Sequence, residues 1–325
     1  MSAIRVVLAL MAVLGLGATP SLAQTYPAKP ARIIVPTSPG GITDTLARAL
    51  AQRLTDFFGQ TVIVENRPAG AGQIGMDFVA KSAPDGYTLM VNSDAAFVVN
   101  PHLYSKLPYD SIADFIPISG LGISPQALVL HPSVPANTLG ELIAYAKTRP
   151  GALNYGTFGI GTSGHLNIIH LESETGTKFI PVHYRGAAPA ITDLLGGHIQ
   201  MMIVAIGLLR QNIEAGKLKA IAIGSRERLP QYPDLPTLSE SGFPGFEQYT
   251  QGLGIVGPAN LPAPVVNRLN EAIRASLVKP ETKEKMSKLG AITEGGSTPA
   301  EFRTFLVKDL ERWERVIKAA GVKAE

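Results

Sequence analysis

Residues 33–58 have the composition of an anion-binding loop between a strand and a helix. A run of β-branched residues ends at Val35, leucines recur at helical spacing from Leu46, and Gly40 and Gly41 lie between them. Glycines at the start of a helix expose backbone N–H groups, and the helix dipole adds partial positive charge there. The loop therefore suits a carboxylate or a phosphate. In the alternative interpretation, the glycines form only a turn and Asp44 is only a first-turn helix residue.

A second glycine-rich loop lies in mid-chain. Residues 159–164 match the dinucleotide pattern Gly-x-Gly-x-x-Gly, but about 20 residues later, where the pattern needs an acid, the chain has Tyr184 and Arg185. What remains is a set of open backbone amides with the hydroxyls of Thr162 and Ser163 at a helix start, which again suits an anion. Two such loops facing each other would clamp a small acid.

Catalytic and metal-binding patterns are weak. No Gly-x-Ser-x-Gly motif is present, although a hydrolase using Ser163 or Ser93 with His165 stays an alternative. His165 and His170 are five residues apart, which is wrong for one helix face, so we expect no metal site, and we expect no cofactor. His165 fits equally a hydrogen-bond donor to a ligand and a structural histidine. Arg185 could pair with a carboxylate or be a solvated surface charge.

Composition narrows the class further. Residues 1–23 read as a secretory signal peptide, with Arg5, a short apolar run and small residues before a cleavage site. The formal net charge is only +3 and Arg5 contributes one of these charges, so we expect no nucleic-acid partner. The chain has no cysteine, which excludes disulfides and thiol catalysis. We therefore expect an exported protein with an ordinary hydrophobic core.

Strand and helix patterns alternate along the chain and favour two α/β blocks with mostly parallel sheets. Residues 101–124 and 230–244 are rich in proline and glycine, so we expect irregular crossing segments there, with a return strand at 249–256. Ligands bind at the carboxyl ends of parallel strands and in clefts between domains.

Two capping boxes predict helix starts at Thr138 and Thr298. The helix after Thr298 carries an apolar stripe that we expect in the core; its residues are Phe302, Phe305, Leu306, Leu310, Trp313 and Ile317.

Several ordered motifs resemble the Bug-type solute receptors of tripartite tricarboxylate transporters. They are Val35-Pro36-x-x-Pro39-Gly40-Gly41-x-x-Asp44, Glu65-Asn66-Arg67-Pro68-Ala69-Gly70-Ala71-Gly72, Ala83-Pro84-Asp85-Gly86-Tyr87, Tyr155-Gly156-x-x-Gly159-x-Gly161-x-x-x-His165 and Tyr184-Arg185-Gly186-x-x-Pro189-Ala190. The resemblance covers essentially all of the chain after residue 23.

The resemblance implies a type II periplasmic binding protein, an α/β fold of two domains with two crossover segments and an interdomain ligand cleft. We expect domain 1 at 24–124 and 247–325 and domain 2 at 125–246. A small carboxylate would be held in the cleft and delivered to membrane permease subunits by a non-enzymatic monomer in the periplasm. The implied ligand-binding residues are Thr37, Ser38, Gly40, Gly41, Asp44, Ser93, Asp94, Ala95, Gly161, Thr162, Ser163, His165, Tyr184, Gly186, Ala187, Ala188, Val204 and Ala205.

Two departures from the family pattern refine this expectation. Thr37 stands where the family often has an aromatic residue, and Val204-Ala205-Ile206-Gly207 offers no acid where the family often has one. Without that acid an ammonium group would lack a partner, so we expect an organic acid without an amine. A sensory co-receptor for such an acid is the remaining alternative to transport.

Overall fold

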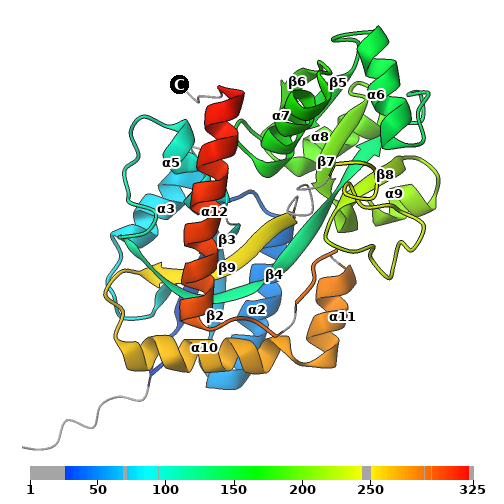
Figure 1. Ribbon diagram of the computed structural model, residues 1–325. Helices are drawn as coiled ribbons and strands as arrows, with labels where there is room; N and C mark the ends of the chain where they lie inside the picture. The colour runs from blue at the N-terminus through cyan, green and yellow to red at the C-terminus, as the bar shows by residue number, and fades with distance from the viewer. Residues whose placement is uncertain are drawn as a thin grey trace, which may run out of the picture.

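The computed structural model describes residues 26–68, 72–93, 95–243, 250–288, 290–293 and 295–321. They form two α/β lobes joined by one long strand, β4 (Phe115–Leu130), which runs from one lobe into the other (Figure 1). The signal peptide expected at residues 1–23 lies outside the described residues. In the part of the chain that is described, no helix has both the length and the apolar character needed to cross a membrane.

Lobe 1 combines the beginning and the end of the chain. Its elements are β1 (Ala31–Val35), α2 (Ile42–Phe58), β2 (Val62–Asn66), α3 (Gln73–Ala80), β3 (Thr88–Ser93), α4 (Ala95–Val98), α5 (Asn100–Leu103), β9 (Thr250–Pro258), α10 (Ala263–Leu277), α11 (Pro280–Lys288) and α12 (Pro299–Ala320).

Lobe 2 is formed by the middle of the chain. Its elements are α6 (Leu139–Thr148), β5 (Asn154–Thr157), α7 (Ser163–Thr175), β6 (Ile180–His183), α8 (Ala187–Leu195), β7 (Met201–Ala205), the 3-10 helix η2 (Ile206–Leu208), α9 (Arg210–Glu214) and β8 (Lys219–Gly224).

The strands follow the order β2-β1-β3-β9-β4-β7-β5-β6, and β8 pairs with β4. The pairs β1–β2, β1–β3, β5–β6 and β5–β7 are parallel, whereas β3–β9 and every pairing of β4 are antiparallel. The expectation of mostly parallel sheets is therefore wrong. The strands of each parallel pair are joined along the chain through helices. Strand β4, which passes from one lobe to the other, is antiparallel to each of its neighbours.

The structure also corrects the irregular segment expected at 101–124. Its second part is strand β4, which pairs with β9 as far as Pro125 and with β7 and β8 from Gln126 onward. The register shifts beside Pro117 and again between Gly120 and Gly122. Proline cannot donate to the ladder and glycine tolerates bulge geometry, so these residues mark bulges in a strand here instead of a loop.

Local signals for helix ends are confirmed. Thr138 accepts a hydrogen bond from Glu141 N at the start of α6, and Thr298 and Glu301 form a complete capping box at the start of α12. Helix α2 ends at Gly59 in the left-handed conformation that glycine adopts without strain.

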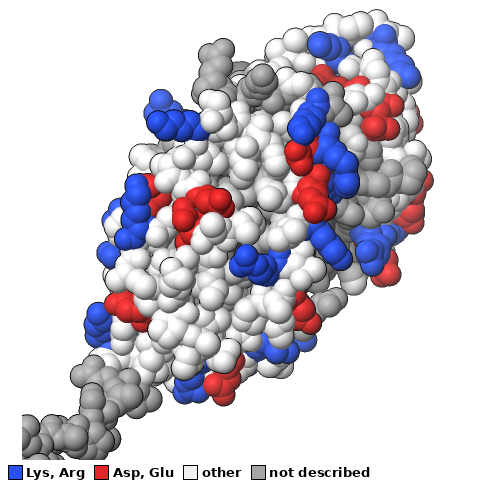
Figure 2. Space-filling model, turned by 60° about the vertical axis from the view of Figure 1, so that its left-hand side comes forward, with Lys and Arg blue, Asp and Glu red and all other residues white. Residues whose placement is uncertain are grey.

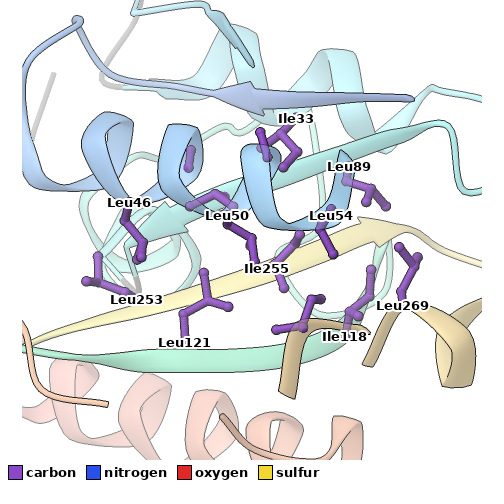
Figure 3. Packing of buried hydrophobic residues seen from close by; sticks show 14 of the residues in the cluster. Ile33, Leu46, Leu50, Leu54, Leu89, Ile118, Leu121, Leu253, Ile255 and Leu269 are labelled. Atoms are coloured by element: carbon purple, nitrogen blue, oxygen red, sulfur yellow. The ribbon is translucent and has the colours of Figure 1, made fainter. Parts of the chain in front are cut away.

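The core of lobe 1 lies between α2, α10 and the sheet. Leu46, Leu50 and Leu54 of α2 point toward Ile33, Leu89 and Ile255 of the strands (Figure 3). The spacing of the leucines therefore brings α2 onto one face of the sheet, and this fixes the position of the loop before it.

A second cluster connects the lobes. Leu166 of α7 packs in one buried cluster with Phe302 and Trp313 of α12. Helix α12 runs along lobe 1 toward lobe 2, where α7 lies (Figure 1). The expected core role of Trp313 is confirmed. Phe305 is an exception because it is 39% exposed, at the edge of the apolar stripe.

Candidate functional site

The loops singled out in the sequence all follow the carboxyl ends of parallel strands. In lobe 1, β1 leads into the loop before α2, and the adjacent parallel strand β3 ends at Ser93. In lobe 2, the parallel strands β5 and β6 lead into the loops before α7 and α8. Within each lobe, the parallel pairing therefore brings two of the predicted loops to one edge of the sheet.

The loop before α2 is braced by Asp44. One carboxylate oxygen accepts from Gly40 N at 3.0 Å and Arg48 Nε at 3.1 Å, and the other accepts from Asn66 Nδ2 at 2.9 Å and pairs with Arg48 Nη2 at 3.0 Å. Burial by itself raises the pKa of Asp44, but these bonds outweigh it and hold the pKa below its usual value. All four acceptor directions of the ionised carboxylate are used, so Asp44 shapes the loop.

The remaining groups of this loop leave the start of α2 open. Gly40 has φ +86°, Gly41 is the N-cap without a side-chain hydrogen bond, and Ser38 and Gly40 are exposed. The carbonyl oxygen of Thr37 accepts from Asn66, while its buried hydroxyl oxygen has no partner among the described residues. Helix α2 therefore begins with backbone donors that no side chain caps.

Helix α7 begins in a similar way. Its N-cap, Thr162, donates its hydroxyl to Gly159 O at 2.7 Å and does not cap the helix. Gly161 has φ +74°, and an added Cβ there would overlap Leu103 of α5. The close approach to lobe 1 therefore requires glycine at this position.

His165 holds the glycine-rich loop. It is 6% exposed, and its Nδ1 accepts from Gly161 N at 3.1 Å, so the neutral ring carries its proton on Nε2. The ring stacks on Tyr155 and meets the edge of His183, with centroids 6.3 Å and 4.9 Å away. Burial, with a smaller contribution from His183, lowers the pKa of His165 to about 4. His165 is thus a neutral structural acceptor at pH 7.

Beside this loop, His183 Nδ1 lies 2.8 Å from Thr157 Oγ1, and burial lowers the pKa of His183. Ser163 Oγ accepts from Gln126 Nε2 at 2.7 Å, and no hydrogen bond joins Ser163 to His165 among the described contacts. The geometry of a serine–histidine pair is therefore not formed here.

Helix α8 also begins without a side-chain cap, as α3 and α10 do. Its N-cap is Gly186, with φ +124° and open space around the position of a Cβ. Tyr184 before it donates to Asp193 Oδ2 at 2.6 Å, and burial, then Asp193, raises the Tyr184 pKa to about 12. Ala187 and Ala188 form the first turn, and Arg185 is exposed.

The other predicted site residues lie at two strand ends. Ser93 is buried at the end of β3, and its N–H donates to Asn92 Oδ1 at 2.8 Å. Ala95 begins α4, and Asp94 lies outside the described residues. Val204 and Ala205 are buried at the end of β7, where Ala205 pairs with Gln126 of β4.

Sequence reasoning missed the polar residues behind the loops. Gln126 and Asn167 hydrogen-bond each other at 2.9 Å and are both 1% exposed. Ser124, fully buried two residues before Gln126 on β4, has no partner for its hydroxyl among the described residues. A glutamine next to the apolar run Ala127–Leu130 was the signal in the sequence.

A separate groove of about 810 Å³ lies at the amino ends of β1 and β3, away from the loops above. The charges along it are largely paired with each other: Arg67 binds Glu65 and stacks on Phe78, and Lys81 binds Asp77. No group of three or more potential metal ligands occurs among the described residues. Over the face shown in Figure 2, positive and negative side chains are interspersed.

The model of the tripartite tricarboxylate transporter family receptor matches residues 46–322. The chain belongs to this family. BugT of Bordetella pertussis is 36% identical over 307 residues, which are 94% of this chain and 94% of the relative.

Solved structures agree with this assignment. The periplasmic binding protein BugD has a TM-score of 0.85 and 34% identity, over 92% of this chain and 100% of that one. A protein from R. palustris with adipate has a TM-score of 0.87 and 32% identity, over 92% of this chain and 99% of that one. MatC from Rhodopseudomonas palustris, with bound malate, has a TM-score of 0.83 and 29% identity, over 90% of this chain and 100% of that one.

The expected family and two-domain fold are confirmed. The chain is a periplasmic binding receptor and not an enzyme, so the hydrolase alternative is set aside. Receptors of this family bind small organic acids and work with tripartite transporters.

Proposed function

We propose that this receptor captures a small organic acid without an amine between its lobes and delivers it to the permease subunits of a tripartite transporter. One observation carries the proposal: α2, α7 and α8, from both lobes, begin at the carboxyl ends of parallel strands without side-chain caps. Their first-turn N–H groups and dipoles favour negative charge. The adipate and malate seen with two neighbours are acids of this class.

The proposed absence of an amine rests on the described residues at two of the loops. The carboxylate of Asp44 is fully engaged within its own loop, and the end of β7 offers the apolar Val204 and Ala205. An ammonium group beside either of them would be desolvated without a carboxylate to pair with, at a cost of several kcal/mol. The residues proposed to contact or shape the ligand are those expected from the sequence, with Asp44 and His165 acting through the loops they brace.

We also propose the domain division at 24–124 with 247–325 and at 125–246, with residues 1–23 removed on export. The change of partner of β4 between Pro125 and Gln126 supports this boundary. Residues 120–125 would then form one hinge, and ligand binding would shift an equilibrium between open and closed lobes. The monomeric state is part of the same proposal.

A thermal-shift panel tests the function. It contains adipate, malate, citrate, aspartate and glutamate, with denaturation followed by mass spectrometry to detect a retained acid. A ligand at 100 times its dissociation constant adds about 2.7 kcal/mol, which raises Tm by roughly 5 °C. We expect a shift with an amine-free acid. Tighter binding of aspartate or glutamate, or no shift and no retained acid, would contradict the proposal.

A further inference from the structure

Gln126 links strand β4 to the first turns of α7. Its side-chain nitrogen donates to Ser163 Oγ at 2.7 Å, and its oxygen accepts from Asn167 Nδ2 at 2.9 Å. Ser163 and Asn167 are four residues apart and therefore share one face of the helix. All three side chains are at least 97% buried, and they lie next to the point where β4 passes from lobe 1 to lobe 2.

The direction of these bonds fixes the role of the Ser163 hydroxyl. A hydroxyl has one proton and two lone pairs, and Gln126 already donates to the oxygen. The proton of Ser163 therefore remains to be donated, and no acceptor for it is present among the described contacts. The amide of Gln126 thus holds the hydroxyl as an outgoing donor at the start of α7.

A second buried hydroxyl at this place also lacks a partner. Ser124 Oγ is buried with no hydrogen-bond partner among the described residues, and Ser124 lies on the same face of β4 as Gln126. Buried polar atoms are nearly always paired in folded proteins. This hydroxyl, independent of the helix end, indicates that this place contacts a polar ligand with an acceptor.

We propose that Gln126 is a positioning residue that makes the α7 end of the site donate only, so that it accepts an ionised carboxylate. The uncapped backbone amides of α7 and the hydroxyl of Ser163 would all donate to the ligand. The hydroxyl of Thr162 donates to Gly159 O instead and is not available to the ligand as a donor. A primary amide or an ammonium at this end would present its own donors to them. The inference rests on the proposed function and names the ligand group that faces lobe 2.

The test is a double-mutant cycle with Ser163→Ala and Gln126→Met. Affinity is measured by calorimetry for whichever of adipate, malate and citrate binds most tightly to the unmodified protein. Ser163→Ala removes one charge-assisted hydrogen bond, so we expect affinity to fall about 10-fold or more. Gln126→Met should weaken binding about 3- to 10-fold when Ser163 is present and less than about 2-fold in the Ser163→Ala background.

Gln200→Met is the matched control. Gln200 also makes two side-chain hydrogen bonds, from Asn154 N at 2.9 Å and to Gly197 O at 3.0 Å, just before β7. We expect it to lower Tm without changing affinity. An equal effect of Gln126→Met in both backgrounds overturns the inference, as does unchanged affinity in Ser163→Ala. If Gln126→Met does not fold, the affinity of Ser163→Ala alone decides the test. Failure of the unmodified protein to bind any of the three acids would instead overturn the proposed function.

Discussion

Two groups of helices in this receptor begin in opposite ways. At α6 and α12, a threonine accepts from the backbone and a glutamate in the first turn adds negative charge, as with Thr298 and Glu301. At α2, α7 and α8, the N-cap is Gly41, Thr162 or Gly186, and no side chain caps the helix. The capped helices satisfy their own ends, whereas α2, α7 and α8 retain donors at the carboxyl ends of parallel strands.

Stability and binding therefore depend on different helix starts in this receptor. A side-chain cap is worth about 1 kcal/mol to a helix, so leaving α2, α7 and α8 without one has a cost. The hydrogen bonds that shape the uncapped loops come instead from braces beside the helix ends, such as Asp44 and His165. Changes at the two groups of helices should therefore affect different measurements.

Converting an uncapped helix into a capped one should have the largest effect. Gly41 has φ −77° and ψ 172°, and an added Cβ would lie 3.9 Å from its nearest neighbour, so Gly41→Asp fits the backbone. The new carboxylate would cap α2 and repel an acid, so affinity for the best ligand of the panel should fall about 100-fold. Calorimetry measures the affinity, and thermal unfolding should show stability unchanged or slightly raised.

Gly41→Ser is the control for charge, since a serine caps α2 without repelling the acid. We expect the affinity to fall about 10-fold in this variant. If Gly41→Asp binds the acid as well as the unmodified protein does, α2 does not hold the ligand, and the contrast between the two groups of helices has no functional meaning.

Acidification should weaken the brace of the α7 loop. The pKa of His165 is about 4 in the folded protein and near 6.5 when unfolded, so the unfolded state binds more protons between these values. The stabilisation is complete above pH 6.5 and is lost as pH falls toward 4. The free energy of unfolding should drop by about 2 kcal/mol between pH 7.5 and pH 5 from this residue.

Urea denaturation at several pH values measures this loss. His165→Gln, which keeps a side chain able to accept from Gly161 N, is the matched variant. Its unfolding free energy should depend less on pH in this window, with the remaining dependence from His183, His170 and the carboxylates. An identical pH dependence in the variant would show that His165 is not the titrating group.

Removing a cap from a capped helix should have the smallest effect. Thr298→Ala deletes the hydroxyl that accepts from Glu301 N at 3.2 Å, so stability should fall by about 1 kcal/mol. Affinity should not change because α12 begins away from the strand ends that carry the uncapped loops. A loss of affinity in Thr298→Ala comparable to that in Gly41→Ser would contradict the distinction between helix starts that stabilise and helix starts that bind.

The sequence predicts much of this architecture because its signals are local. The capping box at Thr298, the stop at Gly59 and the glycines before α2 and α7 are read within a few residues. The part of β4 before Pro125 was missed because the bulges in it use the same prolines and glycines that mark loops. A local pattern of prolines and glycines therefore does not distinguish a bulged strand from a loop.

The polar residues behind the site were missed for a different reason. Gln126 is 37 residues from Ser163 and 41 from Asn167 along the chain, so only the fold brings them together. The bracing role of Asp44 likewise depends on Asn66, which comes from the next strand. Residue types and spacing predict which loops form the site but not which side chains hold them in shape.

The most direct test of the central claim is the change in backbone amide NMR shifts on adding the acid that gives the largest thermal shift. We expect the largest changes at the first turns of α2, α7 and α8, at Thr43, Gly164 and Ala188. We expect little change at Gly140 and Ala300, where side chains cap the helices. Equal changes at both groups, or changes confined to the capped helices, would contradict the proposed role of the uncapped helix starts.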